Sequence, residues 1–112
     1  KKFTMSLSLR TTLGCTEAVL ADDGSLNLFY HVAGIINEDL RIKFLNKEDE
    51  FDAINWDFKY KGHPLTLRYD IYNGISVYPT KVNAALPKDN LAVVELANIL
   101  DGKLFNPMRN IS

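Results

Sequence analysis

Histidine and cysteine, the side chains that most often supply nucleophiles, bases and metal ligands, are scarce in this sequence. Only His31, His63 and Cys15 are present. A zinc site needs three or four ligands with local spacing, and a cysteine nucleophile needs a histidine base that a third group orients. These three residues are far apart and lack such neighbours. We therefore predict no catalytic residues, no metal site, no cofactor and no enzymatic activity. The ordinary interpretation is an exposed turn for His63 and a partly buried, hydrogen-bonded position for His31.

The acidic run KEDEFD, residues 47–52, is the other candidate for chemistry. A calcium loop spaces its oxygen ligands and commonly turns at a glycine, whereas this run has no glycine and is interrupted by Phe51. We predict a solvated loop within a segment, residues 17–57, that holds ten acidic residues against three basic ones. Loops held by a rigid sheet are favourable places for recognition. An acidic loop favours a basic protein partner, and its candidate contact residues are Glu48, Asp49, Glu50 and Asp52.

Strands must position these residues. Residues 54–79 alternate apolar and polar side chains in three runs, INWDFKYKG, HPLTLRYDIYNG and ISVYP, as strands with one buried face do. The breaks carry turn chemistry: Gly-His-Pro at 62–64, where proline cannot donate to a ladder, and Asn-Gly at 73–74, which suits a two-residue hairpin turn. The pattern predicts a central antiparallel meander, with Trp56 buried on its apolar face.

The flanking segments are less regular. Residues 25–37 fit a helical face with Ser25 or Asp23 as cap, and they also fit a strand; length favours the helix, but the sequence leaves both open. The other predictions are a strand over residues 3–10, a short helical turn over 16–21, a strand over 40–44, a helix over 91–100 that is capped by Asp89 or Asn90 and ended by Gly102, and a frayed tail over 106–112.

These elements assemble into an α+β fold. We predict a single domain, residues 1–112, in which two helices pack on one face of an about five-stranded, mainly antiparallel sheet. The opposite face is polar and mixes acids with bases, which argues against binding of nucleic acid because the acids repel phosphates. Its predicted residues are Arg41, Lys43, Asn55, Asp57, Lys59, Thr66, Arg68 and Asp70.

Bulk properties bound the class of protein. With 112 residues, 46% hydrophobic residues and a net charge of −1, the chain is typical of a small globular protein. Its apolar runs all fall short of the roughly 18 residues of a membrane span. A single cysteine favours a reducing compartment, so we predict a cytoplasmic location. The outline of a bacterial lipoprotein signal ending at Cys15 is broken by polar residues, including Thr12 where such signals carry leucine.

The meander WDFKYKG–LTLRYDIYNGISVYP, preceded by SLNLFYHVAGIIN and DLRIKFLN, resembles small bacterial immunity proteins of contact-dependent growth-inhibition toxin systems. The resemblance covers residues 25–79 and rests on pattern. It implies a non-enzymatic protein that binds the C-terminal toxic domain of a cognate effector, often a nuclease, and blocks its active site. A nuclease cleft that binds phosphates is basic, and an acidic inhibitor would complement it.

Three other classes stay open from the sequence alone. The first is a small protein-interaction domain with another partner. The second is a small enzyme that uses His31 or His63. The third is a nucleic-acid-binding domain, whose contacts would come from Arg41, Lys43, Lys59 and Arg68.

Overall fold

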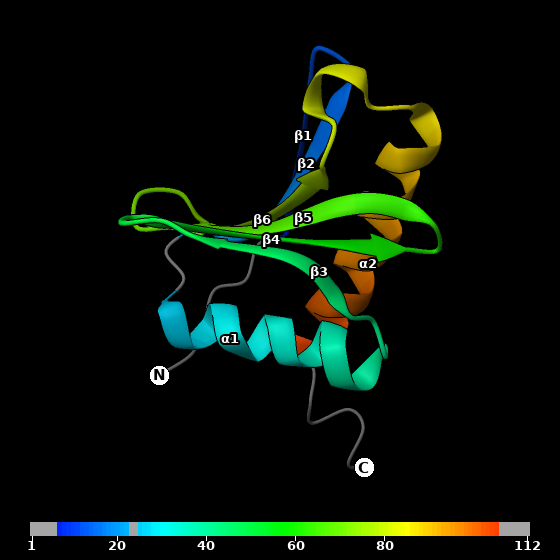
Figure 1. The fold of residues 1–112 in the computed structure, drawn as a ribbon. Helices are drawn as coiled ribbons and strands as arrows, with labels where there is room; N and C mark the ends of the chain where they lie inside the picture. Colours follow the sequence, from blue (N-terminus) through cyan, green and yellow to red (C-terminus); the bar gives the residue numbers. More distant parts are fainter. Residues whose placement is uncertain (1–6, 23–24, 106–112) are drawn as a thin grey trace.

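A computed structural model of the chain describes residues 7–22 and 25–105 and contains one antiparallel sheet with two α-helices packed beside it (Figure 1). A π-helical turn, Ile35–Asp39, extends the first helix, and a 3-10 turn, Val82–Ala84, precedes the second. In chain order the elements are β1 (Ser8–Thr12), β2 (Cys15–Ala21), α1 (Leu26–Gly34), β3 (Phe44–Asp49), β4 (Ala53–Tyr60), β5 (His63–Asp70), β6 (Gly74–Pro79) and α2 (Pro87–Phe105).

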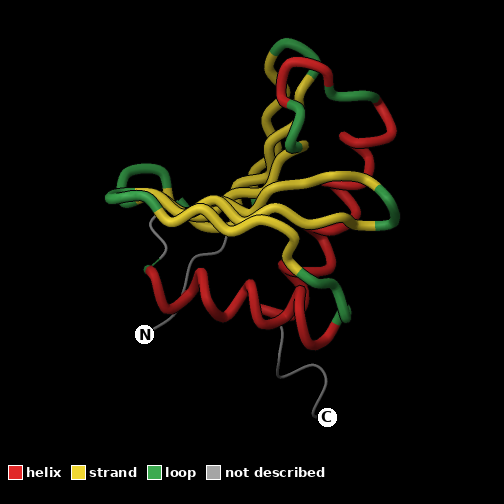
Figure 2. Tube along the Cα trace, viewed as in Figure 1, coloured by secondary structure: helices red, strands yellow, loops and turns green. Residues whose placement is uncertain are grey.

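The six strands are ordered β1-β2-β6-β5-β4-β3, so β1 and β3 form the two edges. Both helices lie against the same face, and one hydrophobic core joins them to the sheet. Within the described residues neither α-helix covers the other face, and Figure 2 shows the β1–β2 hairpin turning steeply away from β3–β5. The predicted α+β class and the placement of both helices on one face are confirmed. The largest fully buried side chains are Phe29, Phe58, Leu20, Ile36, Leu65, Leu67, Ile75, Leu96, Leu100, Val32, Val77 and Val93.

The predicted meander is confirmed as β4, β5 and β6. Trp56 pairs with Leu67, and Leu67 pairs in turn with Val77, so the apolar positions of three strands line up on the helix-covered face. Asn55, Arg68 and Ser76 are aligned in the same way on the uncovered face. The strand period of two is therefore kept over the paired residues. The two-residue turn predicted at Asn73-Gly74 is wrong: Asp70 pairs with Gly74, so the turn spans residues 71–73 and Gly74 begins β6.

The sheet has one strand more than predicted, because the helical turn expected over residues 16–21 is wrong. This segment is β2, and its residues alternate between buried and partly buried positions. Ala18 and Leu20 enter the core, while β1 and β6 pair with the two sides of the strand. The predicted first strand over residues 3–10 is described only from residue 7 onward; the part that is strand runs from Ser8 to Thr12.

The helix predicted over residues 25–37 is confirmed, and Ser25 caps it: its hydroxyl accepts a hydrogen bond from the Leu28 N–H at 3.2 Å. The helix does not stop where a strand over residues 40–44 was predicted. Its π-helical extension closes with hydrogen bonds from the Leu40 N–H to Ile35 O and from the Ile42 N–H to Ile36 O. Residues 41–43 are therefore irregular, and β3 begins only at Phe44.

Helix α2 begins and ends further out than predicted. Pro87 occupies its first position, where a missing N–H costs nothing, and Asp89 reaches back to accept the Leu86 N–H at 3.0 Å, which is half of a capping box. Asp89 thus stabilises the start of α2 from its third position, and it is not the N-cap residue that was predicted. Gly102 does not end the helix, which continues to Phe105. The tail predicted to fray, residues 106–112, lies outside the described residues.

Candidate functional site

The four acids predicted to bind a partner lie on the β3–β4 hairpin and are all exposed. The predicted loop is partly wrong, because Glu48 and Asp49 belong to edge strand β3 and only Glu50 and Asp52 lie in the turn. A hydrogen bond from the Glu50 N–H to Ala53 O, 2.7 Å long, closes this turn. The acids are therefore presented by a hairpin that is anchored in the sheet.

Asp49 differs from the other three acids because it already has a partner. Its carboxylate accepts a hydrogen bond of 2.8 Å from Nε1 of Trp56, and the Lys47 ammonium lies 4.3 Å from the centre of the same indole ring. The prediction that Trp56 is buried on the apolar face holds only in part: the side chain packs against the core on that face but is only partly buried. It packs against Phe29 and Phe44 at ring distances of 5.1 and 5.2 Å, and it lines a hollow on the helix-covered side.

At the same end of the sheet, the register pairs Ala53 with Asp70, so the turn after β3 adjoins the turn after β5 (Figure 1). Three large apolar side chains stand out from these two turns. Phe51 is fully exposed, and Ile71 and Tyr72 are 60% and 77% exposed. An exposed group of large apolar residues beside charged ones is typical of an interaction surface.

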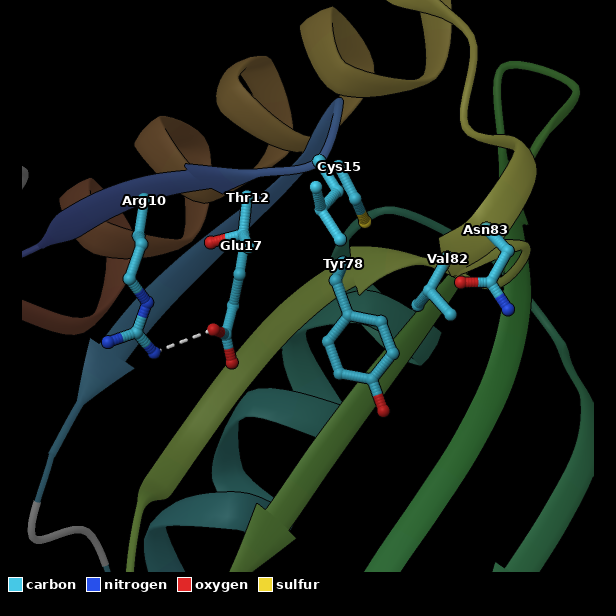
Figure 3. Close-up of a pocket in the computed structure, with 8 residues that line it drawn as sticks. Arg10, Thr12, Cys15, Glu17, Tyr78, Val82 and Asn83 are labelled. Atoms are coloured by element: carbon cyan, nitrogen blue, oxygen red, sulfur yellow. Dashed lines mark hydrogen bonds and ion pairs between the residues drawn. The ribbon is translucent and has the colours of Figure 1, made fainter.

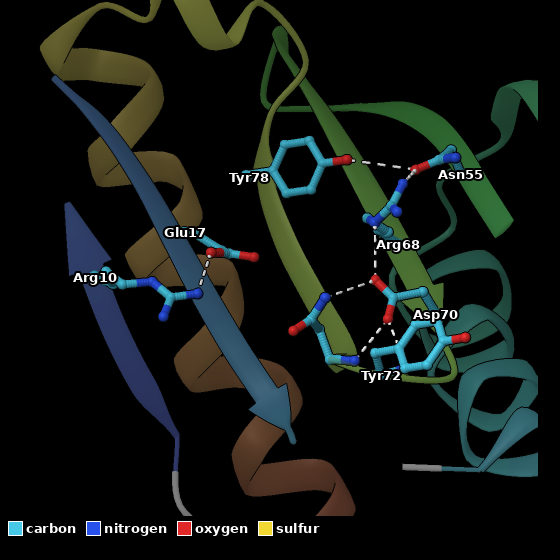
Figure 4. Close-up of polar contacts among 8 residues, drawn as sticks. Arg10, Glu17, Asn55, Arg68, Asp70, Tyr72 and Tyr78 are labelled. Carbon is cyan, nitrogen blue, oxygen red and sulfur yellow. Dashed lines mark hydrogen bonds and ion pairs between the residues drawn. The ribbon is translucent and has the colours of Figure 1, made fainter. Parts of the chain in front are cut away.

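Polar side chains form a hydrogen-bonded network on the uncovered face of the meander, opposite the two α-helices (Figure 4). Arg68 donates to Asn55 at 2.8 Å and to Asp70 at 3.3 Å, and the Tyr78 hydroxyl donates to Asn55 at 3.4 Å. Next to it, Thr66 donates to Asp57 at 2.7 Å. These side chains bond to one another, so the face is a rigid polar surface.

Asp70 is the centre of this network. Its carboxylate is buried, and it accepts the N–H groups of Tyr72 and Asn73 at 2.8 and 2.6 Å and the Asn73 side-chain amide at 3.2 Å. Burial opposes ionisation, but the hydrogen bonds from Asn73 and Tyr72 outweigh it and hold the pKa of Asp70 below its ordinary value. Asp70 therefore fixes the turn that carries Ile71 and Tyr72. This role was not predicted from the sequence, although aspartate ahead of Asn-Gly is a known turn signal.

The uncovered face is hollowed where β1, β2 and β6 meet. Two adjoining hollows of about 340 and 460 Å³ share Arg10 and Glu17, which form an ion pair of 2.8 Å (Figure 3). Burial raises the pKa of Cys15 and of Tyr78, both of which line the smaller hollow. Both thiol and phenol are thus disfavoured as anions, which makes Cys15 a poor nucleophile.

Both predictions for the histidines are wrong: His31 was expected to be partly buried, and His63 was expected in an exposed turn. His31 is exposed on α1. His63 is partly buried, and its Nδ1 lies 2.9 Å from Oδ1 of Asp89. The hydrogen bond from the Leu86 N–H, and next the contact with His63, hold the pKa of Asp89 below its ordinary value. Residues 26 positions apart in sequence meet here because β5 begins beside the start of α2, which local spacing does not reveal.

The basic residues considered for nucleic acid do not form one surface. The prediction that Arg41 and Lys43 lie on the polar sheet face is wrong, because residues 41–43 are not part of a strand. Arg68 is held by Asn55 and Asp70, and Lys59 lies on the uncovered face. Lys43 lines a hollow on the helix-covered side together with Trp56. Within residues 7–22 and 25–105, no group of three or more His, Cys, Asp or Glu side chains is arranged to hold a metal ion. None of the helices in this part of the chain is long and apolar enough to cross a membrane.

No family model, curated protein or solved structure matches this chain.

Proposed function

We propose that this chain is a non-enzymatic immunity protein. It binds the toxic domain of a cognate bacterial effector in the cytoplasm of the producing cell and blocks the active site of that domain. The observation that carries the proposal is the exposed acidic hairpin, Glu48, Asp49, Glu50 and Asp52, held on a rigid sheet edge. The resemblance of residues 25–79 to immunity proteins supports the kind of partner. A basic catalytic cleft is the surface that such a hairpin complements.

The charge distribution supports a basic partner over a nucleic acid. Of the four acids, only Asp49 has a hydrogen-bond partner among the described residues, the Trp56 indole N–H. Glu48, Glu50 and Asp52 remain solvated, and solvated charges at a rim mainly accelerate association. Arg10 and Arg68, in contrast, are paired with carboxylates on the uncovered face. The hairpin thus offers three solvated carboxylates to a basic partner.

The proposed function predicts a large secreted effector encoded immediately upstream of this chain, and the test uses the C-terminal domain of that effector. We expect the two proteins to co-purify, and we expect this chain to protect cells that express the toxic domain. Replacing all four acids by their amides should slow association about tenfold at low salt and flatten its salt dependence. Stopped-flow binding at low and high salt measures both effects.

A matched pair of variants separates position from charge. Glu50→Gln with Asp52→Asn removes two charges from the hairpin, and Glu38→Gln with Asp39→Asn removes the same two residue types from the exposed π-helical turn. Only the first pair should slow association. Unchanged rates for the hairpin pair would exclude the hairpin as the contact, and a wild-type chain that neither binds nor protects would refute the immunity function.

A further inference from the structure

The end of the sheet that carries the acids also carries three exposed apolar side chains, Phe51, Ile71 and Tyr72. The turns that hold them are neighbours because Ala53 and Asp70 are paired in the sheet. Turn geometry favours glycine, proline, asparagine, aspartate and serine at such positions. Nothing in the backbone of these turns requires a phenylalanine, an isoleucine or a tyrosine.

Both turns are held rigid, so these side chains do not fold back onto the core. The Glu50 N–H closes the first turn on Ala53 O, and Asp70 accepts three hydrogen bonds from the second turn. Gly74 then passes so close to the backbone at the end of β2 that a Cβ there would collide with it. A rigid presentation lowers the entropic cost of binding.

We propose that Phe51, Ile71 and Tyr72 form the apolar centre of the toxin-binding interface, and that the acids form its rim. This inference rests on the proposed function, and it adds that the three apolar side chains supply most of the affinity for the toxic domain. Tight interfaces bury a few aromatic anchors at their centre and surround them with polar residues that exclude water. The partner must then present an apolar recess bordered by lysine and arginine.

Charge selects this occupant over two others. An anionic membrane surface accepts apolar tips, but it repels the hairpin acids. A second copy of this chain, docked tip to tip, would bring the two sets of Glu48, Glu50 and Asp52 together, and like charges across an interface are costly. A different protein that presents an apolar recess with a basic rim complements both groups: the recess buries the apolar side chains, and the rim pairs with the acids.

The test compares Phe51→Ser and Tyr72→Ser with Leu91→Ser, which removes a 70%-exposed apolar side chain from α2. The probe is the toxic domain encoded upstream. Each tip variant should dissociate about 30-fold faster, with an association rate and a salt dependence close to those of the wild-type chain. Leu91→Ser should bind like the wild-type chain, and all three variants should keep the wild-type unfolding midpoint, because the replaced side chains are solvated.

The outcomes are distinguishable. If the wild-type chain binds and both tip variants dissociate at the wild-type rate, the apolar centre is wrong while the proposed function stands. If the wild-type chain does not bind, the proposed function fails and this inference fails with it. A wild-type dimer in sedimentation that Phe51→Ser dissolves would assign the surface to a second copy and overturn the proposal.

Discussion

Asp70→Asn removes one charge from the centre of the polar network and leaves the size of the side chain unchanged. Asp70 is 5% exposed. Its Oδ1 accepts the two N–H groups of the turn, and its Oδ2 accepts the Asn73 amide at 3.2 Å and the Arg68 Nε at 3.3 Å. An asparagine that keeps its oxygen toward the turn must point its own NH₂ at these last two donors. Two charge-assisted hydrogen bonds are then replaced by contacts between donors.

The magnitude follows from these contacts. A hydrogen bond to a charged group contributes about 1.5–3 kcal/mol. Both lost bonds are long, and the Arg68 side chain is 34% exposed, so each contributes at the low end of that range. We expect Asp70→Asn to reduce the free energy of unfolding by about 3 kcal/mol at neutral pH, which lowers the melting temperature by roughly 12 °C.

The pH dependence identifies the cause. Because the folded chain holds the pKa of Asp70 below the ordinary aspartate value of 3.8, the ionised carboxylate stabilises the fold above that value. This stabilisation is lost as the pH falls from about 3.8 through the folded pKa. In urea unfolding, the difference between the wild-type chain and Asp70→Asn should therefore be largest at neutral pH and shrink below 3.8.

Asp52→Asn, in the exposed turn, is the control and should change the free energy of unfolding by less than about 0.5 kcal/mol. Two results would refute the reasoning. One is a loss below about 1 kcal/mol for Asp70→Asn at neutral pH, since charged hydrogen bonds would then be absent. The other is a loss that stays constant down to acidic pH, which would assign the effect to packing.

Four further substitutions test the fold. Gly74→Ala should cost at least about 3 kcal/mol, because its backbone is left-handed and its Cβ would meet the end of β2; Gly62→Ala, left-handed but in open space, should cost only about 1 kcal/mol by the same urea titration. Asn90→Ala should cost about 1–2 kcal/mol and speed hydrogen exchange at the Thr16 amide, whose N–H the Asn90 side chain accepts at 2.9 Å. Trp56→Ala should reduce the free energy of unfolding, measured by urea titration, by about 2–3 kcal/mol. This is less than the loss of a fully buried aromatic side chain, because Trp56 is only partly buried; a loss above about 4 kcal/mol would contradict this.

Local pattern predicted the parts of the fold whose cause is local. Alternation over residues 54–79 predicted β4, β5 and β6, since each side chain's exposure is set by the strand period. Ser25 was one of two caps predicted for α1, beside Asp23, and the structure selects it; a cap is readable locally because it acts on N–H groups within three residues of it. Where tertiary pairing competes with local preference, prediction failed. Residues 16–21 are a strand because β1 and β6 flank them. Gly102 also stays helical although glycine often ends helices, and nothing in the structure explains why.

The candidate site divides along the same line. Its charge was readable from the sequence, because four acids within five positions share one short hairpin wherever the chain places it. Its shape was not readable. The register that pairs Ala53 with Asp70 sets Phe51 beside the turn of Ile71 and Tyr72, and burial on a sheet face converts Asp70 from a polar strand residue into the anchor of that turn. Such contacts join residues about twenty positions apart through strand pairing, and the energy that selects the pairing comes from the whole core.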